Sequence, residues 1–121
     1  MKTTSNIENK ICRVIIRDGS PDLTTAKNFS KEMFENCLMS SCNKILVIDQ
    51  LSALYLSDDE LVQLAEYNAH VMPSIIRMAV LCKEKHLEKI KIWESAAVSR
   101  GANVKIFVDN QIAENWLKQT E

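Results

Sequence analysis

Apolar residues fall into two alternating patterns along this chain. In four places they form a short run that is interrupted by at most one basic residue, is rich in β-branched residues and is too short for a helix. Such runs are typical of strands in a largely parallel sheet. They cover residues 11–16, 45–48, 75–82 and 104–108. The run at 45–48 is purely aliphatic and predicts a central strand buried on both faces. Arg13 and Arg17 break the first pattern, which favours an edge or half-covered strand.

Between the runs, apolar residues recur every three or four positions, which is the period of an amphipathic helix. The expected helices cover residues 23–40, 58–69, 87–100 and a C-terminal stretch that Asp109 or Asn110 caps. The second follows Ser57, a good cap, and opens with three acidic residues that favour the positive end of the helix dipole. Gly101 ends the third. The last helix is expected to bury Ile112, Ala113, Trp116 and Leu117.

Strands and helices thus alternate, and this order predicts an α/β fold with a mainly parallel sheet of four or five strands and about four helices. Residues 10–121 are expected to form one domain, and the polar residues 1–9 a loose tail. A short extra strand near the N-terminus could pair antiparallel, and the sequence alone leaves that open.

Composition excludes several classes of function. The net charge is −1 with no basic stripe, which argues against nucleic-acid binding. No apolar run approaches the roughly 20 residues that cross a bilayer, and the N-terminus lacks the apolar segment of a signal peptide. A cytoplasmic protein without a transmembrane segment is therefore expected. The four cysteines, Cys12, Cys37, Cys42 and Cys82, fit reduced thiols.

Candidate chemistry is sparse, so no enzymatic activity, cofactor or metal is expected. Cys82 and His86 could form a nucleophile–base pair, but the simpler interpretation is a buried cysteine and a solvated loop histidine. His70 follows a helix and suits its negative end. The cysteine spacing contains no metal-ligand pair, and two glycines are too few for a phosphate-binding loop. Trp93 and Trp116 are expected to anchor packing.

Two stretches resemble STAS domains, the superfamily of sulfate-transporter and anti-anti-sigma-factor domains. The stretch Asp49–Leu61, DQLSALYLSDDEL, resembles their Asp-Leu-Ser…Asp-Ser-Ser-Gly-Leu segment. Met78–Leu81, Val104–Asp109 and the later Ala113 with Trp116-Leu117 are similar to the SpoIIAA-like branch. The resemblance covers roughly residues 44–117 and implies a STAS-like or SpoIIAA-like fold.

The resemblance does not extend to the residue that is phosphorylated in anti-anti-sigma factors. In anti-anti-sigma factors, the first Ser of Asp-Ser-Ser-Gly accepts a phosphate, and Asp58 occupies that position here. A carboxylate carries part of the charge that a phosphate would bring. Ser57 supplies a hydroxyl one residue earlier and is a weak candidate for phosphorylation, since its simplest role is to cap the helix.

The leading hypothesis is a non-enzymatic regulatory or signalling module that binds a protein partner. The resemblance implies a surface around residues 51–60, and an exposed apolar loop would supply an interaction patch. The candidate partner-binding residues are Leu54, Tyr55, Leu56, Ser57, Asp58 and Asp59. A homodimer through a sheet edge or through this loop is also possible.

Two alternatives stay open. The first is a small-ligand binding domain, for a lipid or a nucleotide, with a pocket between the sheet and its helices. The second, less favoured, is a receiver-like domain in which Asp49 accepts a phosphoryl group and Asp18 helps to bind Mg²⁺. Against it, no acidic pair follows the first strand, and Cys82 stands where Ser or Thr is expected.

Overall fold

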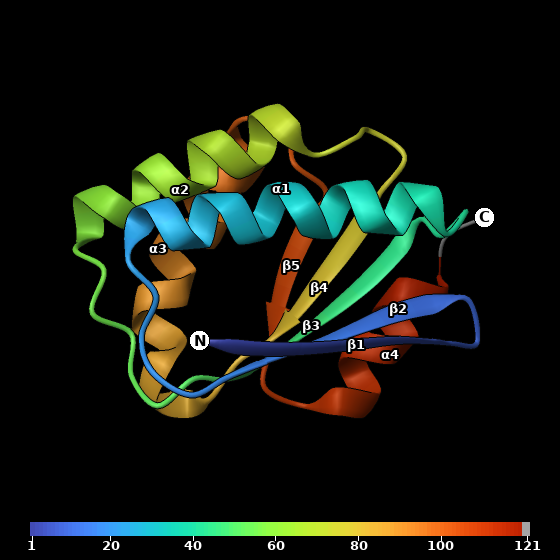
Figure 1. Cartoon of the computed structure of the whole chain (residues 1–121), viewed down its shortest axis with the longest axis horizontal. Helices are drawn as coiled ribbons and strands as arrows, with labels where there is room; N and C mark the ends of the chain where they lie inside the picture. The colour runs from blue at the N-terminus through green and yellow to red at the C-terminus, as the bar shows by residue number, and fades with distance from the viewer. Residues whose placement is uncertain (120–121) are drawn as a thin grey trace.

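A five-stranded sheet with helices on both faces forms the structure, a computed structural model that describes residues 1–119. The strands lie in the order β1-β2-β3-β4-β5, which is also their order along the chain (Figure 1). The elements are β1 (Lys2–Glu8), β2 (Ile11–Arg17), α1 (Leu23–Met39), β3 (Lys44–Gln50), α2 (Asp58–Val71), β4 (Arg77–Leu81), a 3₁₀ turn η1 (Glu84–His86), α3 (Leu87–Ser99), β5 (Val104–Phe107) and α4 (Asn110–Lys118).

The predicted α/β class and the four helices are confirmed, but the sheet is mixed. β2, β3, β4 and β5 pair in parallel, whereas β1 pairs antiparallel with β2. The loose tail predicted for residues 1–9 is instead the edge strand β1 over most of its length. Every residue of β1 is exposed, so the apolar pattern that reveals a buried strand is absent from this segment.

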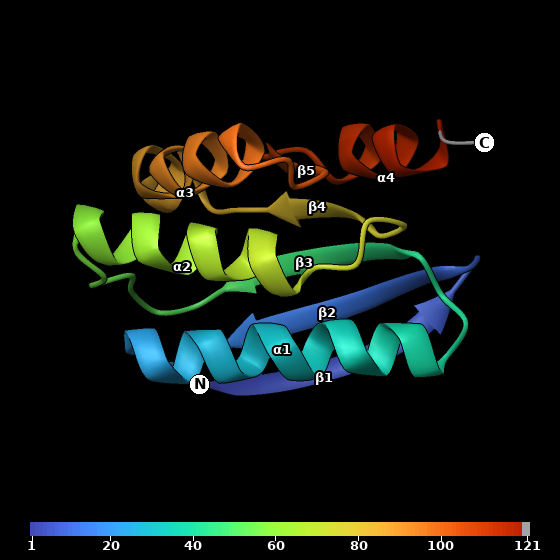
Figure 2. The same cartoon turned by 90° about the horizontal axis from the view of Figure 1, so that it is seen from above.

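Two hydrophobic layers hold the sheet, one on each face. Helices α1, α2 and α3 lie side by side across one face (Figure 2), and α4 covers part of the other (Figure 1). The central strand β3 serves both layers, because Ile45 and Val47 face the three helices and Leu46 packs with Ala113 and Leu117 of α4. The predicted burial of this strand on both faces is confirmed.

Side chains at the helix ends explain where the helices begin. Asp22 Oδ1 accepts a hydrogen bond from the Thr25 backbone N–H at 2.7 Å, and this bond lowers the pKa of the Asp22 carboxyl. Asp109 Oδ1 accepts from the Ile112 N–H at 3.0 Å and caps α4. Gly101 follows α3 with a left-handed φ of +91°, as predicted for its end.

Two sequence-based details are wrong in this part of the fold. Ile112 is exposed instead of buried, because the apolar face of the short helix α4 is completed by Ala113, Trp116 and Leu117. The fourth strand begins at Arg77 and leaves Ile75 exposed before it, since the 72–76 segment first makes a turn closed by the Ile76 N–H on the Pro73 carbonyl.

Candidate functional site

The seven-residue loop between β3 and α2, residues 51–57, lies at the carboxyl edge of the sheet and is called the β3–α2 loop here. It has no regular structure, yet lysines of the β4–α3 connection and of the first turn of α3 donate hydrogen bonds to its backbone carbonyls. Lys83 Nζ donates to the Leu51 carbonyl at 2.8 Å and Lys89 Nζ to the Leu56 carbonyl at 2.7 Å. Lys85 Nζ donates to the Ser52 carbonyl at 2.9 Å. These bonds fix the loop against the start of α3.

The turn after β2 holds the same loop from the opposite side. The N–H groups of Ser52 and Ala53 both donate to the Gly19 carbonyl, and the Tyr55 N–H donates to Ser20 Oγ at 2.9 Å. Gly19 has a φ of +81°, a conformation that glycine adopts without strain. The loop is therefore held by polar contacts on two sides.

A buried carboxylate–imidazole pair lies beneath the loop. Asp49, near the end of β3, and His86, just before α3, are 5% and 4% exposed. His86 Nδ1 donates to Asp49 Oδ2 at 2.7 Å, and the Leu51 N–H donates to Asp49 Oδ1 at 3.0 Å. Among the described residues, nothing hydrogen-bonds His86 Nε2. The pair joins the loop to the β4–α3 connection.

The prediction of a solvated His86 is therefore wrong, and sequence reasoning missed its pairing with Asp49. A signal was available, because adjacent parallel strands bring their carboxyl ends to one edge of the sheet. An acid at the end of β3 and a histidine shortly after β4 share that edge. Cys82 is buried, as expected, and burial together with the nearby Asp49 charge raises the pKa of its thiol.

The predicted exposed apolar cluster is reduced to one residue. Tyr55 is 82% exposed, whereas Leu56 is 4% exposed and packs in the core. Leu54 is half-buried and packs against the same core. Burial of its two apolar neighbours leaves Tyr55 as the residue that projects. Ser57, Asp58 and Asp59 beside it are exposed, so the surface combines one aromatic ring with acidic groups.

Ser57 caps α2, as its sequence context predicted. Ser57 Oγ accepts from the Glu60 N–H at 3.1 Å, and Glu60 Oε1 accepts from the Ser57 N–H at 3.0 Å. This reciprocal capping box satisfies two backbone donors at the helix start. Asp58 Oδ1 lies 3.8 Å from Lys89 Nζ, at the exposed surface.

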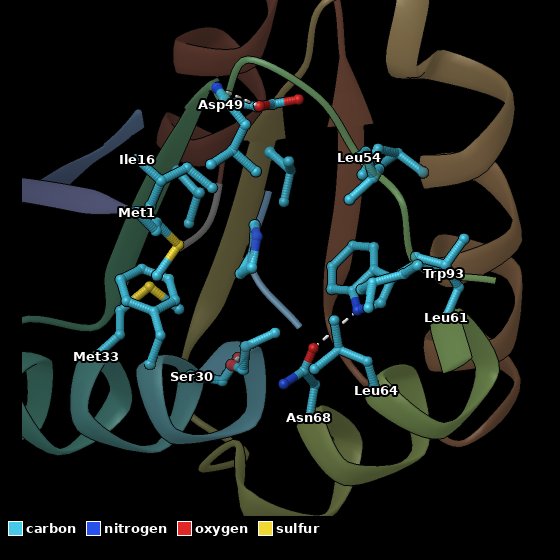
Figure 3. Close-up of a pocket in the computed structure, with 18 of the residues that line it drawn as sticks. Met1, Ile16, Ser30, Met33, Asp49, Leu54, Leu61, Leu64, Asn68 and Trp93 are labelled. Carbon is cyan, nitrogen blue, oxygen red and sulfur yellow. Dashed lines mark hydrogen bonds between the residues drawn. The ribbon is translucent and has the colours of Figure 1, made fainter. Parts of the chain in front are cut away.

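A cavity of about 110 Å³ lies between the sheet and the three helices of that face (Figure 3). Its wall is almost wholly apolar and includes Leu54 and Leu56 of the loop, Leu61 of α2 and Trp93 of α3. Asp49, Ser30 and Asn68 are the polar side chains in the wall. Trp93 is buried, as predicted, and Trp116 packs on the other face with Phe107 and Arg77.

Three thiols gather at the opposite, amino edge of the sheet. Cys37 Sγ donates to the Cys42 carbonyl at 2.9 Å, and Cys42 Sγ donates to the Lys10 carbonyl at 3.1 Å. Burial, with Cys42 nearby, raises the pKa of the Cys12 thiol, and burial with both neighbours raises that of Cys37 to about 12. All four cysteines are free and buried.

Within residues 1–119, no group of His, Cys, Asp and Glu side chains is arranged to hold a metal ion. None of the described helices combines the length and the apolar character needed to cross a bilayer. In comparisons with known proteins, the chain matches no protein-family model and no curated protein.

Proposed function

We propose that this chain is a non-enzymatic regulatory module that binds a protein partner through Tyr55 and the acidic start of α2. The observation that carries this proposal is the exposure of Tyr55 on a loop held from two sides. A tyrosine offers a large amphipathic contact, and a fixed loop loses little entropy on binding. Aromatic residues of this kind are enriched at protein interfaces.

The chemistry of the carboxyl edge supports binding over catalysis. The raised pKa of Cys82 keeps its thiol protonated, which makes it a poor nucleophile. Asp49 is buried, and each of its oxygens already accepts a hydrogen bond, one from Leu51 and one from His86. Burial keeps a phosphoryl donor from reaching either oxygen, so the geometry disfavours the receiver-like alternative.

Residues 44–117 resemble STAS and SpoIIAA-like domains. This resemblance supports the assignment of partner binding to Tyr55 and the start of α2, because it implies recognition around this loop and helix start. Asp58, at the position of the phosphorylated serine, gives the surface a permanent negative charge. On this proposal the module presents that charge constitutively, without a kinase.

A capture experiment with matched variants tests the proposal. The full chain, Tyr55→Ala and Asp58→Lys are immobilised and exposed to a lysate of the source cells, with Ile75→Ala as the control. Ile75 is also an exposed apolar residue, but it lies before β4 at the other edge of the sheet. A partner retained by the control and lost by both loop variants supports the proposal. A partner retained equally by all four proteins contradicts it.

The cavity favours a second candidate function, the binding of a small ligand. Its almost wholly apolar wall fits an apolar molecule better than a nucleotide, whose sugar and phosphate groups would lose their water there without enough polar partners. Native mass spectrometry of the freshly purified chain tests this candidate. A retained small molecule supports it, and a bare protein mass favours the interaction module.

A further inference from the structure

Asn68 of α2 is the unusual feature of the cavity wall. Its side chain is 3% exposed in mainly apolar surroundings. Trp93 Nε1 donates to Asn68 Oδ1 at 2.8 Å, the dashed bond in Figure 3. An indole N–H can only donate, so this bond determines which way the amide is oriented. The oxygen faces Trp93, and the nitrogen must face elsewhere.

The amide nitrogen is consequently a buried donor without an acceptor. Among the described residues, nothing accepts a hydrogen bond from Asn68 Nδ2. Figure 3 shows this nitrogen turned away from Trp93, towards the side of the cavity where Ser30 of α1 lies. Buried polar groups are nearly always hydrogen-bonded, so an orphaned donor in a cavity wall points to a ligand atom that accepts.

Ser30 adds a complementary group to the same wall. Its hydroxyl donates to the Ala26 carbonyl at 3.0 Å, which leaves the oxygen free to accept. Asp49, the other polar wall residue, accepts hydrogen bonds from the Leu51 N–H and from His86 Nδ1, and its charge disfavours an anion beside it. Asn68 thus offers a ligand a donor, and Ser30 offers it an acceptor.

The volume limits the size of the occupant. An engineered apolar cavity of about 150 Å³ in another protein accepts benzene. The cavity here, about 110 Å³, is of the same order, which suits a molecule with one small ring or a short aliphatic chain.

We propose that the cavity binds an uncharged, ring-sized apolar molecule with one hydroxyl or carbonyl oxygen, which accepts a hydrogen bond from Asn68 Nδ2. This inference rests on the second candidate function and specifies its ligand. It does not depend on Tyr55 or on a protein partner, so the capture experiment and the test below fail independently.

Phenol and toluene form a matched pair of probes, since they differ by a hydroxyl in place of a methyl group. A purely apolar cavity prefers toluene, because phenol would lose water from its hydroxyl without compensation. The proposal predicts that the full chain binds phenol at least as tightly as toluene in calorimetric titrations. Phenol is also expected to shift the Asn68 side-chain amide resonances in an ¹⁵N spectrum. Weaker binding of phenol than of toluene, or no binding of either, would overturn the proposal.

In a Trp93→Phe background, which removes the indole N–H that would otherwise lose its acceptor, Asn68→Leu sharpens the test, because leucine has nearly the same shape and no donor. The ratio of phenol to toluene affinity is expected to fall at least roughly tenfold in this variant, as for a lost hydrogen bond to an otherwise unpaired group. Ala26→Leu, which fills the cavity from α1, is expected to abolish binding of both probes. An unchanged affinity ratio in Asn68→Leu overturns the assigned role of Asn68. If that variant does not fold, the comparison of the two probes on the full chain decides.

Discussion

The two edges of the sheet each bury a polar cluster, and the two clusters differ in kind. At the amino edge, Cys12, Cys37 and Cys42 are buried free thiols, and the sulfurs of Cys37 and Cys42 donate to backbone carbonyls. At the carboxyl edge, Asp49 and His86 form a buried ionisable pair beneath an irregular loop. The first cluster behaves as small packed side chains, whereas the second fixes the position of a surface.

This difference shows which edge of the sheet depends on specific polar contacts. Thiols pack with little need for exact partners, so the amino edge requires only burial. A buried charge must be paired and hydrogen-bonded, so the carboxyl edge constrains the loop, the end of β3 and the start of α3 together. Ligands of open α/β sheets generally bind at this edge. The predictions below test this contrast.

The largest expected effect is the chemical protection of the amino-edge thiols. Raising the pKa of Cys37 from 9.0 to about 12 lowers its thiolate fraction at pH 8 roughly thousandfold, and only the thiolate reacts. Alkylation by iodoacetamide is followed by mass spectrometry of Cys37 peptides. It is expected to be at least roughly a thousandfold slower in the native chain than in the chain unfolded in urea. Equal rates in native protein and in urea would contradict the burial of this thiol.

The same shift gives a pH dependence of stability with a definite sign. The folded pKa of Cys37 lies above the unfolded value, so folding favours the protonated thiol. Its stabilising contribution is complete below about pH 9 and is lost as the pH rises towards 12. Urea unfolding across this range is expected to show a smaller alkaline loss in Cys37→Ala than in the unmodified chain. If the free energy of unfolding fell equally with rising pH in both proteins, the raised pKa of Cys37 would be contradicted.

Asp49→Ala is expected to destabilise the carboxyl edge of the sheet. It removes the acceptor of both His86 Nδ1 and the Leu51 N–H and leaves a buried imidazole without a partner. The free energy of unfolding should fall by about 3 kcal/mol in urea titrations. Glu35→Ala, an exposed acid of α1, is the control and should change it by less than about 0.5 kcal/mol. A similar small loss for both variants would show that the pair does not support the loop.

The contrast between the edges also shows what the sequence can reveal. The aliphatic run of β3 and the helical periodicity predicted the main elements, because both patterns record burial directly. The fully exposed β1 carries no such pattern, so the sequence left an antiparallel N-terminal strand only as an open possibility beside a loose tail. The Asp49–His86 pair joins residues 37 positions apart, and only the neighbouring ends of β3 and β4 bring them together.

The candidate surface was predictable only in part. The capping role of Ser57 follows from three neighbouring residues and was confirmed. The separation of Tyr55 from Leu54 and Leu56 was not predictable, because an irregular loop has no period that tells which apolar residue faces inward. The role of Asn68 also depends on contact between α2 and α3, which no local pattern encodes.

Ser57→Ala is expected to have an intermediate effect at the carboxyl edge. It removes the acceptor of the Glu60 N–H and should lower the free energy of unfolding by about 1 kcal/mol. Ser57→Asp keeps a capping oxygen and should restore most of that loss, which thermal unfolding can measure. If Ser57→Asp were as unstable as Ser57→Ala, the hydroxyl would have a role other than capping.

Lys83→Met tests whether the lysines hold the β3–α2 loop. Methionine keeps much of the length of the side chain but cannot donate to the Leu51 carbonyl. The global stability should fall by about 0.5–1 kcal/mol, and amide hydrogen exchange at residues 52–55 should become faster. Lys91→Met, on the exposed side of α3, is the matched control and should leave exchange in the loop unchanged.

The smallest effect on stability is expected at Tyr55, the residue on which the proposed function depends most. Its side chain is 82% exposed, so Tyr55→Ala should change the free energy of unfolding by less than about 0.5 kcal/mol. Leu56→Ala, one residue further and buried in the core, should lower it by about 3 kcal/mol. A residue that is unimportant for folding but required for partner capture serves recognition. If Tyr55→Ala were as destabilising as Leu56→Ala, its ring would belong to the core, and the β3–α2 loop would lose its distinction as a binding surface.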